Sequence, residues 1–152
     1  FVSKAGAGEF GSITARKKYA KDTPQAEEVT PKQINDLEKF ADKLLAKYKI
    51  DVTFTRHFVD RMNDTRNSPD IKIAELQKLF KKIQKNKGKN ILSNPDIEAV
   101  LKDMTADLNL PVVINYNNGE FELVTKTIMR KKNFSTSSKE LRYEEWKRTL
   151  FP

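Results

Sequence analysis

The sequence predicts an α+β fold in which N-terminal helices pack on a small antiparallel sheet. Two observations support this prediction. Apolar residues recur at helical spacing between residues 30 and 108, whereas residues 112–125 alternate between apolar and polar side chains. Helices followed by paired strands, without strand–helix–strand alternation, are typical of this class. The length of 152 residues suits one domain.

The first helix is expected to begin at residues 30–33 (Thr-Pro-Lys-Gln) and to end near Lys49. Thr30 suits the N-cap, Pro suits the first helical position, and Gln completes a capping box. Residues 51–55 then predict a short strand or an extended lead-in, and residues 57–62 have the spacing of a short helix.

Two more helices are expected from the apolar spacing. One follows a turn at residues 67–70, has a heavily cationic solvent side and is broken near Gly88. Its buried stripe is predicted to consist of Ile73, Leu76, Leu79, Phe80 and Ile83. The other is expected over residues 94–108, with helical character ending at Pro111.

A β-hairpin is predicted around Asn118-Gly119, because a type I′ turn needs positive φ at both central residues. Its second strand is expected to continue to Met129 and to exit into the basic residues 130–132. Alternation along this strand places Lys126, Ile128 and Arg130 on one side.

Four regions are predicted along the chain. Residues 1–12 contain Glu-Phe and Gly-Ser pairs of the kind that cloning sites encode, and residues 13–29 form a basic flexible arm. Residues 30–134 form the single domain, and residues 135–152 form a polar C-terminal tail with scattered apolar positions. This tail is expected to be a segment that docks on a partner protein, or a helix packed on a neighbour.

Composition narrows the classes of function. With 29 Lys and Arg against 21 Asp and Glu, the net charge is +8, which favours polyanionic partners. Cysteine is absent and His57 is the only histidine, which excludes thiolate sites and argues against a His-rich metal centre. No apolar run is long enough for a transmembrane helix. We therefore expect no metal, no cofactor and no membrane contact.

His57 and Arg61 are four residues apart and share a face if their segment is helical. An imidazole that transfers a proton beside a guanidinium that holds phosphate is half of a metal-independent ribonuclease. The alternative is structural: His57 caps a helix, and Arg61 pairs with Asp60 or Asp64.

Other basic residues are candidates for binding phosphates in nucleic acid. They are Arg66, Lys81, Lys82, Lys85, Lys126, Arg130 and Lys131. The alternative is a solvated helix face and a positively charged exit from the sheet. Phe134 and Tyr143 are candidates for stacking on bases. The acidic pairs Asp60/Asp64 and Asp103/Asp107 are better explained as ion-pair partners and as a solvated helix face, respectively, than as a metal centre.

The residues Phe-Thr-Arg-His-Phe-Val-Asp-Arg at 54–61, followed by the helix at 75–83, resemble the phage early-transcript endoribonucleases of the RelE-like toxin superfamily. The Thr-rich strand at 123–128 is similar as well. The resemblance covers residues 50–130 and implies a RelE-like domain, with His57 as the proton-transfer group and Arg61 as a phosphate ligand. It also implies a second histidine where this chain has Lys81, which is a poor base at its ordinary pKa.

Three functional hypotheses follow. The first is an RNA-binding, metal-independent endoribonuclease that acts in the host cytoplasm and is of phage origin. The second is a non-enzymatic virion or interaction protein that docks through its basic face and its tails. The third is a toxin-like module cut from a longer polypeptide.

Overall fold

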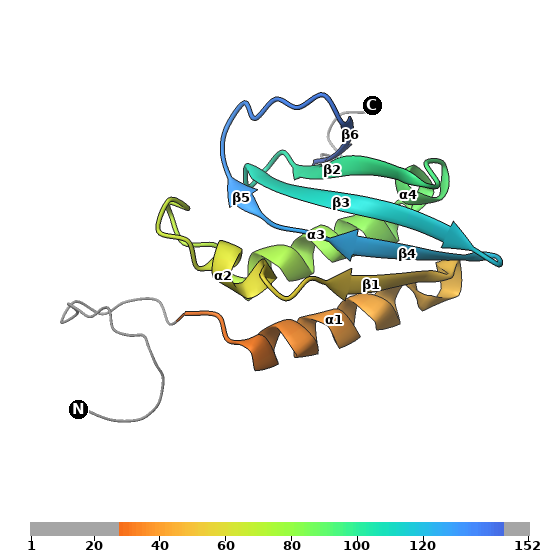
Figure 1. The fold of residues 1–152 in the computed structure, drawn as a ribbon, viewed down its shortest axis with the longest axis horizontal. Coiled ribbons are helices and arrows are strands. Elements are labelled where there is room, and N and C mark those ends of the chain that lie inside the picture. Colours follow the sequence, from red (N-terminus) through yellow and green to blue (C-terminus); the bar gives the residue numbers. More distant parts are fainter. Residues whose placement is uncertain (1–27, 145–152) are drawn as a thin grey trace, which may run out of the picture.

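The computed structural model describes residues 28–144 and contains helices and a mixed six-stranded sheet (Figure 1). The predicted cloning-derived residues, almost all of the basic arm and the last eight residues lie outside this range. The helical elements are α1 (Pro31–Leu45), the 3₁₀ helix η2 (Ala46–Tyr48), α2 (Phe58–Met62), α3 (Ile73–Lys85) and α4 (Lys89–Leu92). The strands are β1 (Ile50–Phe54), β2 (Ile97–Asp103), β3 (Leu108–Asn117), β4 (Glu120–Thr125), β5 (Met129–Arg130) and β6 (Lys139–Tyr143).

The α+β class is confirmed, but the sheet is larger than expected and is not purely antiparallel. Its order is β1-β4-β3-β2-β6, and β5 pairs with the start of β3. The central strands are antiparallel, whereas β1 lies parallel to β4 and β6 lies parallel to β2. These parallel pairings join segments far apart in the sequence, so local patterns carry no signal for them.

The two long helices pack on one face of the sheet (Figure 1). Thr30 forms the predicted capping box with Gln33, and α1 buries Ile34, Leu37, Ala41 and Leu45. Most of the predicted stripe of α3 is buried, with Ile73 only partly covered. The predicted hairpin is present, with φ of 52° at Asn118 and 82° at Gly119. Local signals therefore predicted these elements correctly.

The third predicted helix is wrong. Residues 97–103 form β2, which pairs antiparallel with β3 from Ile97↔Ile114 to Asp103↔Leu108. The positions of the apolar residues Val100 and Leu101 are compatible with a helix and with a strand, and pairing with β3 decides in favour of the strand. Pro111 lies inside β3 instead of ending a helix. The Pro111 carbonyl accepts from Lys126 N at 2.9 Å. Because the nitrogen and the carbonyl of one strand residue point to the same side, the nitrogen of Pro111, which carries no hydrogen, faces the region beyond the end of β4.

Beyond β4 the chain does not continue as one strand to Met129. The ladder with β3 ends at Thr125, and only Met129 and Arg130 pair again with β3, as β5. The sheet also extends past the predicted domain end at residue 134, because residues 139–143 form β6 beside β2. Part of the predicted docking tail therefore belongs to the sheet, and residues 145–152 of the tail lie outside the described residues.

The edge strand β1 is covered by carboxylates of α1. Asp42 Oδ1 accepts from Val52 N at 2.7 Å, and the Glu38 carboxylate accepts from the Phe54 backbone. Burial raises the pKa of Glu38, and burial together with nearby Asp42 and Glu122 raises the pKa of Asp51. Negative charge thus gathers at this edge, where it also discourages pairing with another strand.

Within residues 28–144, the helices are too short or too polar for any of them to cross a bilayer.

Candidate functional site

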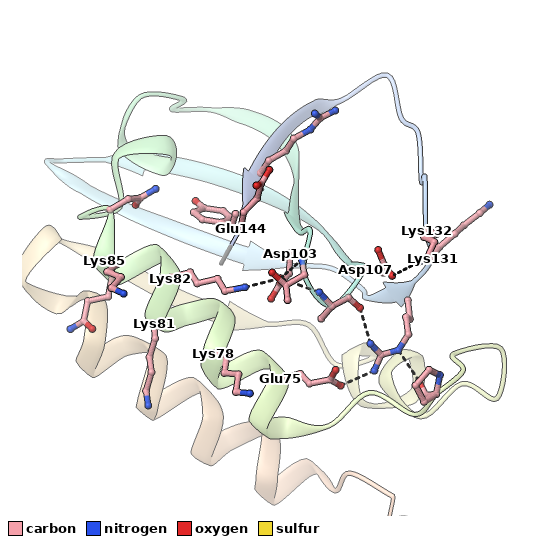
Figure 2. Close-up of a pocket in the computed structure, with 18 of the residues that line it drawn as sticks. Glu75, Lys78, Lys81, Lys82, Lys85, Asp103, Asp107, Lys131, Lys132 and Glu144 are labelled. Carbon is pink, nitrogen blue, oxygen red and sulfur yellow. Dashed lines mark hydrogen bonds and ion pairs between the residues drawn. The ribbon is translucent and has the colours of Figure 1, made fainter. Parts of the chain in front are cut away.

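A cleft of about 1600 Å³ lies beside α3 and is the candidate site (Figure 2). One wall is the solvent side of α3 from Glu75 to Asn86. The other walls come from the loop at Ser68–Pro69, the turn between β2 and β3, the segment around β5, and the end of β6. Eight basic and four acidic side chains line it, so the lining is predominantly cationic.

Four lysines of this lining have no ion pair within the described part of the chain: Lys78, Lys81 and Lys85 on α3, and Lys131 after β5. The three on α3 are spaced by three and four residues and so share one side of the helix. At about 1.5 Å of rise per residue they extend over roughly 10 Å. We refer to Lys78, Lys81 and Lys85 as the α3 lysine row. All four of these lysines are exposed.

Lys82 also lines the cleft, but its charge is used within the protein. Its Nζ lies 2.9 Å from Asp103 Oδ1, and only 19% of the Lys82 side chain and 3% of the Asp103 side chain are exposed. The same carboxylate oxygen accepts from the backbone of Thr105 and Ala106 in the β2–β3 turn. Figure 2 shows Lys82 reaching across to Asp103, whereas Lys78, Lys81 and Lys85 end away from the acidic side chains.

Arg130 lines the cleft as well, but its side chain is 10% exposed and serves the fold. The guanidinium donates to the backbone carbonyls of Pro69, Asp70 and Ala106 at 2.7–3.0 Å and to Glu75 Oε1 at 2.7 Å. Burial alone would raise the pKa of Glu75, but the hydrogen bonds from Arg130 and the Lys72 backbone, together with the charges of Arg130 and Lys72, lower it. Arg130 therefore has a structural role, and its expected role as a phosphate ligand stays a prediction.

His57 and Arg61 do not line the cleft. His57 precedes α2, is exposed, and makes no capping hydrogen bond with its side chain. Arg61 is exposed on α2, and neither side chain has an ion pair within residues 28–144. Lys81 lines the cleft, so the three predicted catalytic residues do not share one concavity.

Two further predicted phosphate ligands also lie outside the cleft. Arg66 is held by Asp64 at 2.7 Å, and this side-chain hydrogen bond lowers the pKa of Asp64 to about 2. Lys126 lies 3.5 Å from Glu98. Both pairs are exposed, so neither adds much stability.

Neither of the two aromatic residues predicted to stack on bases is fully exposed. The Phe134 ring is half-buried and lies 5.8 Å from Lys102 Nζ, which also donates to the Phe134 carbonyl. Tyr143 lines the cleft but is 4% exposed. Its hydroxyl and Asn86 Oδ1 are buried without hydrogen-bond partners among the described residues. Burial raises the pKa of Tyr143 to about 12, and the nearby Asn90 and Asn86 side chains oppose this increase.

In the part of the chain that the structure describes, no cluster of three or more Asp, Glu or His side chains could hold a metal ion. The lining of the cleft suits an anionic ligand better than a cation.

Comparison with protein-family models, with curated proteins and with solved structures finds no match for this chain. The resemblance to the RelE-like superfamily therefore stays a prediction.

The sequence pointed to part of this site. Lys81, Lys82, Lys85, Arg130 and Lys131 do line the cleft. Sequence reasoning missed Lys78, although its spacing from Lys81 and Lys85 was a usable signal. It also missed Lys132, Arg142 and Asp103, which come from strands and turns far from α3 in the sequence.

The structural role of Arg130 predicts that Arg130→Ala lowers the free energy of unfolding by about 3 kcal/mol, because four acceptors lose a buried charged donor. The neighbouring Lys131→Ala, at an exposed side chain, should change it by less than about 0.5 kcal/mol. Urea unfolding followed by circular dichroism measures both. Equal stability of the two variants would contradict the structural role.

The buried phenol predicts a difference between the wild type and Tyr143→Phe at high pH. Tyrosine in the unfolded chain ionises near its ordinary pKa of 10.0, whereas in the folded protein the pKa is about 12. The stability that the neutral phenol contributes is therefore complete below pH 10 and disappears as the pH rises toward 12. Urea midpoints should fall more steeply for the wild type than for the variant over this range. Parallel pH profiles would contradict the burial of a neutral Tyr143.

Proposed function

We propose that this protein binds RNA through the cleft beside α3. The observation that carries the proposal is the α3 lysine row facing the cleft with Lys131, all four without an ion pair in the described part of the chain. Lysines that neutralise phosphates release condensed counterions, which favours binding of a nucleic acid backbone. The net charge of +8 supports the same conclusion.

The shape of the cleft supports a single strand rather than a duplex read in its grooves. The α3 lysine row follows the helix along the cleft, and the turn and strand segments form the opposite wall, so a flexible backbone can lie along this side of α3. Lys82 and Arg130 hold these walls in place from within the protein. Binding therefore needs no large rearrangement of the cleft.

Removal of charge from the α3 lysine row is expected to weaken binding. The double variant Lys81→Gln/Lys85→Gln should bind a labelled single-stranded oligouridine on the order of tenfold more weakly, measured by fluorescence anisotropy. The slope of log K against log salt should also become less steep by about 0.7 for each phosphate that the variant no longer neutralises.

The matched control is Lys39→Gln/Lys43→Gln on α1. These two exposed lysines have the same spacing and the same total charge, but they lie away from the cleft. An equal decrease of affinity in both double variants would mean that only net charge matters, and would contradict a localised site. A single-stranded DNA of the same length distinguishes a preference for RNA from general binding of single strands.

Cleavage of RNA is the second candidate function, and it rests on the exposed His57 and Arg61, which have no ion pair within residues 28–144. A metal-independent nuclease needs the imidazole and the cations to act on the same phosphate. His57 and Arg61 lie outside the lining of the cleft, which favours binding over cleavage.

We therefore expect RNA incubated with the protein in EDTA to stay intact on a denaturing gel. The outcome that contradicts this is cleavage by the wild type that is abolished in His57→Ala while folding and RNA affinity are unchanged. That result would establish the endoribonuclease. Cleavage that persists in His57→Ala would instead indicate a contaminating nuclease.

A further inference from the structure

We propose a second contact site for single-stranded RNA at the tip of the β3–β4 hairpin, where Tyr116 stacks on an unpaired base. We define the tip patch as Tyr116, Phe121 and the four lysines around them, Lys47, Lys49, Lys87 and Lys89. This inference shares its ligand with the proposed function, but it uses a separate surface, and none of these residues lines the cleft.

The ring of Tyr116 is unusually open. Tyr116 is 46% exposed, and among the described residues only Met104 is another large hydrophobic side chain with comparable exposure. Tyr116 continues the core-facing row of Val112 and Ile114 along β3. The hairpin, however, extends past the ends of both long helices (Figure 1), and Tyr116 lies near its tip as the second-last residue of β3. An exposed aromatic ring on a rigid strand is suited to base stacking.

The ring is also held in place before any ligand arrives. Its centroid lies 4.7 Å from that of Phe121, directly opposite on β4, with 54° between the ring planes. The Tyr116 backbone donates to Asp96 Oδ1 at 3.1 Å, and the tight turn at Asn118-Gly119 fixes the strands on either side. A preorganised ring loses little conformational entropy on binding.

Lysines from two other segments meet at the same end of the molecule. The Lys49 carbonyl accepts from Phe121 N at 2.9 Å, which places Lys49 beside the aromatic pair. Gly88, between Lys87 and Lys89, packs so closely that a Cβ there would lie 2.7 Å from Ile50 Cδ1, next to Lys49.

These lysines are available to phosphates. Lys47, Lys49, Lys87 and Lys89 are exposed and have no ion pair within residues 28–144. Carboxylates of the same segments are Asp96, which accepts from the Tyr116 backbone, Glu120 at the start of β4, and Asp51 and Glu122, which lie opposite each other on β1 and β4. Cations beside an exposed aromatic ring fit a base with its phosphate.

The test compares binding of an oligoadenylate with binding of an abasic oligonucleotide of the same length, by fluorescence anisotropy. Tyr116→Leu should bind the oligoadenylate about tenfold more weakly than the wild type, because no ring remains for a base to stack on. Tyr116→Phe should bind it like the wild type, since the ring is kept. Neither variant should change affinity for the abasic strand. Met104→Ala is the control for removal of an exposed hydrophobic side chain and should leave both affinities unchanged.

The inference is overturned if Tyr116→Leu binds the oligoadenylate as tightly as the wild type, or if its affinity for the abasic strand falls by the same factor. It is also overturned if the variant only changes the sedimentation of the protein, because the patch would then be a contact between copies of this chain. Weaker binding by Tyr116→Leu but not by Lys81→Gln/Lys85→Gln would retain the tip patch and reject the cleft. Absence of any binding by the wild type would reject both.

Discussion

The buried guanidinium of Arg130 is the interaction on which the geometry of the cleft depends. It joins β5 to two regions that are distant from it in sequence: residues 69–75, through the carbonyls of Pro69 and Asp70 and the Glu75 carboxylate, and the β2–β3 turn, through the Ala106 carbonyl. Removing a guanidinium from water costs several kcal/mol unless acceptors surround it, and here four acceptors do so. Displacement of any one of these segments would therefore leave the same buried guanidinium with fewer hydrogen-bond acceptors. Because the segments form the walls beside α3, the shape of the cleft follows from this one side chain.

The same residue types have different roles in this protein according to the acceptors around them. Lys82 and Lys81 are neighbours on α3, yet Lys82 is held by the buried Asp103 carboxylate and Lys81 faces solvent. The cationic surface that is available to a ligand consists of the basic side chains that, like Lys81 and unlike Lys82, are not paired with a carboxylate of the protein. On the other edge of the sheet, Glu38, Asp42 and Asp51 gather negative charge beside β1.

Sequence reasoning succeeds where the structure is decided locally and fails where it is decided by distant partners. The capping box at Thr30, the apolar stripe of α3 and the Asn118-Gly119 turn each depend on residues within a few positions. The apolar residues of β2 fit a helix as well as a strand, and only pairing with β3 and β6 separates the two. For the site, the lysine row is visible as a run on one helix. The structural role of Arg130 is not, since most of its acceptors are backbone carbonyls, which a sequence does not display.

The cleft lies along α3, and part of the tip patch comes from the segment that directly follows this helix. The lysine row leads along the helix toward Lys87 and Lys89, which belong to the patch around Tyr116. A helix of 13 residues is about 20 Å long, so both contact sites are within reach of one extended strand. Two weak contacts on a rigid scaffold reinforce one another, because binding at one raises the effective concentration at the other. Phosphate contacts in the cleft supply the salt-dependent part of such binding, and stacking at the tip supplies a part that depends on the presence of bases. In the proposed complex, a flexible single strand is therefore held by phosphate contacts along α3 together with base stacking at the tip.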